Sequence, residues 1–154
     1  MKVDAVKVTI RKMRKSDLSV VSGLAMLPNP HAKKEKYAKY IATALKAYPN
    51  LSFVALTNGA VVGYAQAEKR NGLAVLEDIA VEEKYQSKNI GKQLLEKVIH
   101  TLKDKGAKAV LAEVHYKCAK AIPFYYKHGF RIAGSAQDYF GVGHDVVILK
   151  LVLE

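Results

Sequence analysis

Residues 76–95, LEDIAVEEKYQSKNIGKQLL, decide the fold of this chain. The segment 74–81 is apolar except for Glu77 and Asp78, which is typical of a buried strand. A short polar turn follows, and a helix then begins near Ile90 with apolar side chains at three- and four-residue spacing. We therefore predict a strand, a tight turn and a helix in direct succession.

The predicted turn has the properties of an anion-binding site. The first backbone N–H groups of a helix have no partner within the helix, and the helix dipole adds partial positive charge there. Gly91 leaves room for a ligand, and Asn89 tolerates left-handed backbone angles. Ser87, Lys88 and Lys92 add candidate side-chain contacts. We expect a phosphate or pyrophosphate here, with an ordinary structural turn as the alternative, because neither GxxxxGK[ST] nor GxGxxG is present.

The other segments predict a sheet with helices between its strands. We expect strands at 6–10, 51–57, 61–68, 73–81, 109–114, 130–134 and 145–153, and helices at 16–25, 33–48, 90–105 and 118–128. Asn58-Gly59 predicts a hairpin turn, Asn71-Gly72 a second tight turn, and Gly106 the cap of the long helix. The order is β-α-α-β-β-β-α-β-α-β-β, which we assign to a single domain over 1–154.

Composition narrows the class of protein. The 154 residues carry a formal net charge of +11, which attracts anions of any kind. Clustered basic residues with interleaved aromatics do not stand out, which argues against a nucleic-acid-binding module. Cys118 is the only cysteine, so no intrachain disulfide is needed. We predict no metal site. No apolar run suits a signal peptide or a membrane span, so we expect a cytoplasmic protein.

Two motifs resemble those of the GNAT superfamily of N-acetyltransferases. The acetyl-CoA-binding motif of that family is (Arg/Gln)-x-x-Gly-x-(Gly/Ala) after a strand ending in valine. Gln86 and Gly91 match its first and last positions, and Asn89 stands in place of glycine. Residues 118–130, CAKAIPFYYKHGF, are similar to the family segment N-x-x-A-x-x-F-Y-x-K-x-G-F, with Cys118 in place of asparagine.

The resemblance implies an α/β (α+β) fold with a mixed, mostly antiparallel sheet of about seven strands and about four flanking helices. It also implies a splay between the strands ending near Val81 and Val114. The pantetheine arm of acetyl-CoA would bind backbone groups in this gap like an added strand, and a backbone N–H near Ile79 or Ala80 would polarise the thioester oxygen. The implied cofactor-binding residues are Ile79, Ala80, Val81, Gln86, Ser87, Lys88, Asn89, Ile90, Gly91, Lys92, Cys118 and Phe124.

The resemblance also suggests a catalytic acid and a base. Tyr125 matches the family tyrosine that protonates the departing thiolate, although Tyr126 is an adjacent alternative. Glu77 is the candidate base that takes a proton from the amine. Strand alternation predicts that Glu77 shares a face with Ile79, whereas Asp78 points the other way and is structural. A structural carboxylate is the alternative for Glu77.

The acceptor is predicted only as a primary amine. Leu27-Pro28-Asn29, the strand 51–55 and Tyr139-Phe140 before His144 resemble protein N-terminal acetyltransferases, whereas Leu76-Glu77-Asp78 resembles spermidine/spermine acetyltransferases. Tyr139, Phe140 and His144 are therefore candidate substrate contacts, or simply residues that close the sheet edge. Residues 33–40 would flank the same entrance. A non-catalytic acyl-CoA sensor stays open as a different class, and so does a homodimer.

Overall fold

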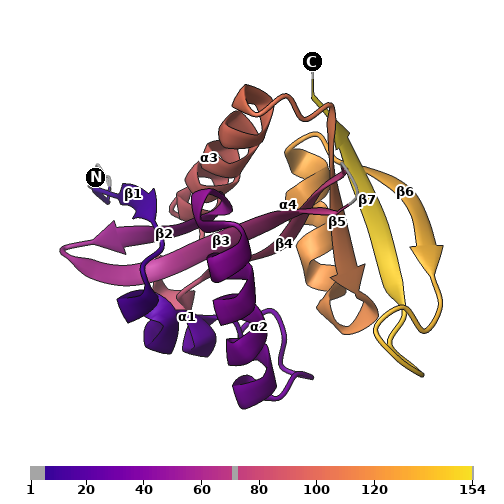
Figure 1. The fold of residues 1–154 in the computed structure, drawn as a ribbon, viewed down its shortest axis with the longest axis horizontal. Coiled ribbons are helices and arrows are strands. Elements are labelled where there is room, and N and C mark those ends of the chain that lie inside the picture. Colours follow the sequence, from indigo (N-terminus) through magenta and orange to yellow (C-terminus); the bar gives the residue numbers. More distant parts are fainter. Residues whose placement is uncertain (1–5, 71–72, 154) are drawn as a thin grey trace.

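The computed structural model describes residues 6–70 and 73–153, which fold around one seven-stranded sheet (Figure 1). The strands are β1 (Thr9–Lys12), β2 (Ser52–Thr57), β3 (Ala60–Arg70), β4 (Leu73–Val81), β5 (Ala109–His115), β6 (Arg131–Ala136) and β7 (Val146–Val152). The α-helices are α1 (Leu18–Leu24), α2 (Lys34–Ala47), α3 (Ile90–Asp104) and α4 (Ile122–Lys127). Four 3-10 turns join them: η1 (Lys15–Asp17), η2 (Pro49–Leu51), η3 (Glu83–Tyr85) and η4 (Tyr116–Ala121). The predicted order of strands and helices is confirmed.

The sheet has the order β1-β2-β3-β4-β5-β7-β6, and only its β4–β5 pair is parallel. That pair spans three rungs and ends at Leu76 opposite Ala112. β4 continues to Val81 and β5 to His115 without pairing to each other. The predicted splay between these two strands is therefore confirmed, and it leaves part of the β4 backbone free to bind a ligand.

Helices cover both faces of the sheet (Figure 1). On one face, α3 buries Ile90, Leu94, Leu95, Val98 and Leu102 against the strands, and Tyr125 of α4 joins the same cluster. On the other face, α1 and α2 pack on Val54, Tyr64 and Ala80. Both sides of the central strands are buried, which agrees with their nearly continuous apolar sequence.

Several local predictions are confirmed and two need correction. Asn58 and Gly59 have positive φ in the β2–β3 hairpin, as expected. Gly106, just after α3, has φ +81°. The first strand lies at Thr9–Lys12 instead of 6–10. Its partner β2 ends at Thr57, so β1 pairs only from Thr9 onward, and the Thr57 hydroxyl donates to the Lys7 carbonyl just before that point. The Asn71-Gly72 turn lies outside the described residues.

The second correction concerns the helix predicted at 118–128. This segment divides into η4 and α4, with non-helical backbone angles at Cys118 (φ −105°, ψ 23°). The α-helical part begins at Ile122 and has Pro123 in its first turn, where the N–H that proline lacks would have no partner within the helix. As a result, Phe124 and Tyr125 lie on the short helix α4, apart from Cys118 in η4.

Candidate functional site

A cavity of about 620 Å³ lies beside the end of β4, in the part of that strand that no longer pairs with β5. The end of β4, the turn after it, the start of α3 and one side of α4 form its walls. Its lining residues are Ile79, Val81, Tyr85, Gln86, Ser87, Asn89, Ile90, Gly91, Lys92, Ala121, Phe124, Tyr125, Lys127 and His128. Most predicted cofactor residues therefore meet in one place.

The turn between η3 and α3 has the backbone conformation that an anion-binding site requires. Ser87 and Asn89 both have left-handed angles, with φ of +62° and +63°. Asn89 precedes the first helical residue, and its side chain does not cap the helix. The side-chain amide of Gln86 donates to the Val81 carbonyl at 3.0 Å and so closes the turn. The first N–H groups of α3 are thus left for a ligand at the positive end of a 15-residue helix.

Three predicted cofactor residues do not line this cavity. Ala80 packs on the opposite face with α1 and α2, so only its backbone is available from the β4 edge. Lys88 is exposed outside the cavity wall. The Cys118 thiol instead donates to the Pro28 carbonyl in the α1–α2 loop. Four further residues line the cavity and were not predicted from the sequence: Tyr85, Ala121, Lys127 and His128. Of these, Lys127 fits the basic character of a phosphate site.

Tyr125 and Tyr126 occupy clearly different environments. Tyr125 is 7% exposed, lines the cavity and packs edge-to-face on Phe124 and Phe130, with ring centroids 5.5 and 5.3 Å away. Burial, with a smaller contribution from the nearby Asp78 charge, raises the pKa of Tyr125 well above its usual value. Tyr126 is 49% exposed, and the Arg131 guanidinium lies 4.2 Å from its ring centroid. Of the two tyrosines, Tyr125 alone faces the site.

The predicted face of Glu77 was wrong, because β4 contains a bulge. Gln66 of β3 pairs with Asp78 and the next residue pairs with Leu76, so Glu77 is an extra residue in the ladder. The bulge breaks the alternation of side chains. Glu77 and Asp78 both reach α2, where Tyr40 and Tyr37 donate to them. Ile79 lies instead with the cluster that α3 covers.

Glu77 has the environment of a group that exchanges protons. Its two oxygens accept from the Tyr40 hydroxyl at 2.5 Å and from the Arg70 guanidinium at 2.6 Å. Burial raises the pKa of Glu77 to about 8, a hydrogen bond with Glu68 acts in the same direction, and Tyr40 and Arg70 oppose both. A carboxyl group with this pKa exchanges its proton near neutral pH.

Asp78 is a buried anchor for the α1–α2 segment. One of its oxygens accepts from the Tyr64 hydroxyl at 2.5 Å, the Asn29 amide at 2.8 Å and the Tyr37 hydroxyl at 3.0 Å. Burial raises the pKa of Asp78 to about 6, while these donors oppose the shift. The hydrogen bonds agree with the predicted structural role, although Asp78 points toward the same helix as Glu77.

The predicted substrate residues lie in the loop between β6 and β7. Tyr139 and Phe140 are 44% and 52% exposed and contact each other edge-to-face. The Arg70 guanidinium lies 3.4 Å from the Tyr139 hydroxyl, which links this loop to the Glu77 cluster. His144 bonds His115 at the end of β5 across 2.9 Å between ring nitrogens. The loop therefore meets the open end of the splay.

Four residues on this side of the sheet were not predicted from the sequence. Arg70 and Glu113 form an ion pair at 2.7 Å beside Glu77. His31 of the α1–α2 loop stacks on His115, with ring centroids 3.9 Å apart. No sequence motif points to them, because they meet only through strand pairing and loop packing. Within residues 6–70 and 73–153, no group of three or more His, Cys, Asp or Glu side chains is arranged to hold a metal ion.

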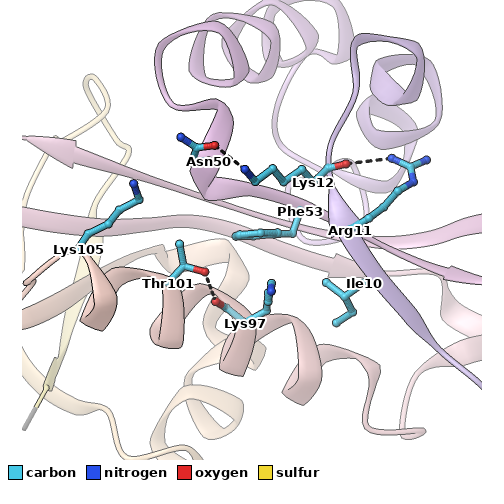
Figure 2. Close-up of a pocket in the computed structure, with 8 residues that line it drawn as sticks. All are labelled: Ile10, Arg11, Lys12, Asn50, Phe53, Lys97, Thr101 and Lys105. Carbon is cyan, nitrogen blue, oxygen red and sulfur yellow. Dashed lines mark hydrogen bonds between the residues drawn. The ribbon is translucent and has the colours of Figure 1, made fainter.

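A second cavity, of about 400 Å³, lies between β1 and α3 (Figure 2). It is lined by Ile10, Arg11, Lys12, Asn50, Phe53, Lys97, Thr101 and Lys105, and it shares no lining residue with the cavity at the splay. Lys12 donates to Asn50 at 2.7 Å, and the Lys97 ammonium lies 5.8 Å from the Phe53 ring centroid. None of the predicted site residues lies there.

Comparison with known proteins agrees with this geometry. Residues 19–130 match the profile of the acetyltransferase (GNAT) family. The chain is 29% identical to an N-alpha-acetyltransferase of Sulfurisphaera tokodaii, covering 94% of this chain and 92% of that protein. Its fold resembles Ard1 from Thermoplasma volcanium, with a TM-score of 0.86, 24% identity, and 97% and 100% of the two chains covered. It also resembles a GNAT acetyltransferase from Elizabethkingia anophelis with acetyl-CoA bound, with a TM-score of 0.77, 24% identity, and 98% and 100% covered.

The chain belongs to the GNAT family of acetyltransferases. It is an enzyme that uses acetyl-CoA as its acetyl donor. Among the residues that the structure describes, no helix is long and apolar enough to cross a membrane.

Proposed function

We propose that this enzyme transfers the acetyl group of acetyl-CoA to a primary amine by direct attack in a ternary complex, with a protein N-terminus as the first candidate acceptor. The observation that carries the proposal is the splay. One cavity, lined by the turn at 86–91 and by Tyr125, opens at the same strand separation where Glu77 lies on the other face of the sheet. A donor and an acceptor can thus approach one point from two sides.

The residues around the cavity fit a nucleotide thioester. The left-handed turn offers the free N–H groups at the start of α3 to a pyrophosphate, and the basic side chains of Lys92 and Lys127 line the same cavity. The β4 segment beyond Leu76 has no β5 partner, so it can bond the amides of a pantetheine arm. When bound, acetyl-CoA supplies the activated acetyl group. Backbone N–H groups near Ile79 or Ala80 would stabilise the charge that develops on the thioester oxygen.

Glu77 is our candidate for the base. The α-ammonium of a protein N-terminus has a pKa of roughly 8, and the alkylammonium of a polyamine has one of roughly 10. Either group must lose a proton before its nitrogen can attack. Glu77 would accept that proton directly or through one water. Because the pKa of Glu77 is raised to about 8, the carboxylate is a stronger base than an ordinary glutamate.

Tyr125 is our candidate for the acid. As the amine nitrogen bonds to the acetyl carbon, the carbon–sulfur bond breaks and the electron pair goes to sulfur. The phenol would donate its proton to that thiolate. The new amide nitrogen would release its second proton to solvent, and solvent would return a proton to the phenolate. Its raised pKa keeps the phenol protonated throughout the neutral range.

A protein N-terminus is favoured by the N-alpha-acetyltransferase of Sulfurisphaera tokodaii, which matches nearly the full length of the chain. The exposed aromatic pair Tyr139 and Phe140 offers apolar surface for the first residues of a peptide. A small polyamine is the second candidate, because Glu68, Glu77 and Glu113 gather around Arg70 and create a local negative charge in a basic protein.

The test is thiol release from acetyl-CoA with a panel of peptides, polyamines, amino acids and aminoglycosides. We expect release that depends on a free amine, with peptides as the best acceptors. Matched peptides with blocked N-termini are the control. Release that is the same for free and blocked peptides would contradict the peptide acceptor, and absence of release with every amine would contradict the proposed reaction.

A further inference from the structure

Arg70 occupies the point at which the two central strands separate. Leu76 and Ala112 form the last β4–β5 rung, and the next residues are Glu77 and Glu113. The Arg70 guanidinium bonds both carboxylates, Glu77 at 2.6 Å and Glu113 at 2.7 Å, and it also bonds Glu68 of its own strand. One side chain therefore bridges the two strands at the first residues that no longer pair with each other.

The charges around Arg70 do not balance. Three carboxylates face one guanidinium, a total of −2 when all four groups are ionised. The three carboxylate side chains are only 7–14% exposed, whereas that of Arg70 is 35% exposed. The other titratable groups facing the cluster are Tyr40 of α2 and Tyr139 of the β6–β7 loop, and both are neutral phenols at ordinary pH. Arg70 is thus the one cation among the described residues that directly bonds this cluster.

Arg70 and Glu68 have opposite effects on Glu77. The positive charge of Arg70 favours the ionised form of Glu77, while the neighbouring Glu68 favours the protonated form. The guanidinium also fixes one oxygen of Glu77, and Tyr40 fixes the other. Removing the guanidinium would leave three crowded carboxylates, of which Glu77 is the one on the bulge beside the opening.

We propose that Arg70 is a positioning residue for acetyl transfer: it orients Glu77 and favours its ionised form at the opening between β4 and β5. The proposal rests on the proposed function, in which Glu77 takes the proton from the amine. Arg70 then acts through Glu77 without contacting the donor or the acceptor. Its removal lowers the fraction of enzyme whose base is ready, so the loss of rate depends on pH.

The test is the pH dependence of kcat/KM for the wild type, Arg70→Met, Arg70→Lys, Glu68→Gln and the double variant Arg70→Met/Glu68→Gln. For Arg70→Met we expect the acidic limb of the kcat/KM profile to move to higher pH by about one unit. A neighbouring cation shifts the pKa of a carboxyl group by about one to three units, and the lower value applies because Arg70 is partly exposed. At pH values below the limb, kcat/KM then falls by about tenfold, and the loss shrinks at high pH. Arg70→Lys should lie between the wild type and Arg70→Met, since an ammonium restores the charge without the planar geometry that bonds three carboxylates at once.

Glu68→Gln supplies the opposite perturbation. It removes a negative neighbour of Glu77, so the limb should move to lower pH, and in the double variant it should reverse part of the Arg70→Met shift. If Arg70→Met lost activity only through altered packing, the added Glu68→Gln change would not move the limb back toward the wild type. If Arg70→Met does not fold, the shifts of Arg70→Lys and Glu68→Gln, which are expected in opposite directions, test the same claim.

An equal loss of rate at every pH in Arg70→Met, or an unmoved limb in Arg70→Lys and Glu68→Gln, would overturn the role of Arg70. The variant Glu77→Gln distinguishes an error in the role of Arg70 from an error in the proposed function. The free acceptor amine adds its own acidic limb, at the same pKa in every variant. If the remaining wild-type limb persists in Glu77→Gln, Glu77 is refuted as the base, and the role of Arg70 falls with it. A wild type that acetylates no amine refutes the proposed reaction itself.

Discussion

Replacing Tyr125 with Phe removes one hydroxyl group and leaves the ring. The two aromatic contacts of the ring, with Phe124 and Phe130, should therefore persist. Within the described part of the chain the hydroxyl has no hydrogen-bond partner, and the residue lines the cavity. Tyr125→Phe therefore tests the role of the hydroxyl in the reaction while the packing of the ring is kept.

The magnitude follows from these contacts. With no hydrogen bond lost, the free energy of unfolding should change by less than about 0.5 kcal/mol. For a chain of 154 residues, 1 kcal/mol corresponds to about 3 °C, so Tm should move by less than about 2 °C. Loss of a positioned general acid lowers turnover by about 10²–10⁴-fold, equivalent to about 3–5 kcal/mol in the barrier. Because the pKa of Tyr125 lies far above neutral, the loss should not vary between about pH 6 and 9.

The assay measures kcat by thiol release, the acetyl-CoA Kd by calorimetry and Tm by circular dichroism. We expect a large fall in kcat and a Kd within a few-fold of the wild type. Tyr126→Phe is the matched control, because Tyr126 is the next residue but lies exposed against Arg131. The reasoning is refuted if Tyr125→Phe turns over within about threefold of the wild type, or if Tyr126→Phe causes the same loss.

Three further changes test other parts of the account. Glu77→Gln should remove the acidic limb of the pH profile near 8, since activity needs the ionised carboxylate and is lost as pH falls through its pKa; kcat/KM from pH 6 to 10 measures this. Asn89→Ala places an alanine at φ +63° and should lower Tm by about 3 °C, or roughly 1 kcal/mol, whereas Asn89→Gly should keep or raise it in the same melting experiment. Asp78→Ala leaves the buried Tyr64 hydroxyl without its acceptor and should cost about 2 kcal/mol in urea unfolding, and an unchanged midpoint would contradict its role as an anchor.

Much of the fold could be predicted because local sequence and global topology agree. Asn58-Gly59, Asn89 and Gly106 have the positive φ angles that their residue types permit. The α3 helix buries the apolar face that its spacing predicted. The motifs at 86–91 and around Tyr125 meet in one cavity, because the turn and α4 flank the same strand opening.

The errors arise where pairing between distant segments decides the outcome. Period-two alternation put Glu77 on the wrong face, because the bulge in β4 appears only when its register against β3 is known. Arg70 and Glu113 are separated by 43 positions in sequence and meet through β3, β4 and β5. Cys118 was expected beside the cofactor, yet its backbone is non-helical within η4 and its thiol donates to the Pro28 carbonyl.

The most direct test of the central claim is mass spectrometry of a peptide incubated with the purified enzyme and acetyl-CoA. The peptide should contain no lysine, so that its α-amine is the only primary amine, and the same peptide with a blocked N-terminus is the control. The account predicts one added acetyl group, located on the first residue of the free peptide and absent from the blocked one. If this peptide and every polyamine tested stay unmodified while acetyl-CoA still raises Tm, the protein binds the donor without acetylating these amines, and the proposed acetyl transfer is contradicted.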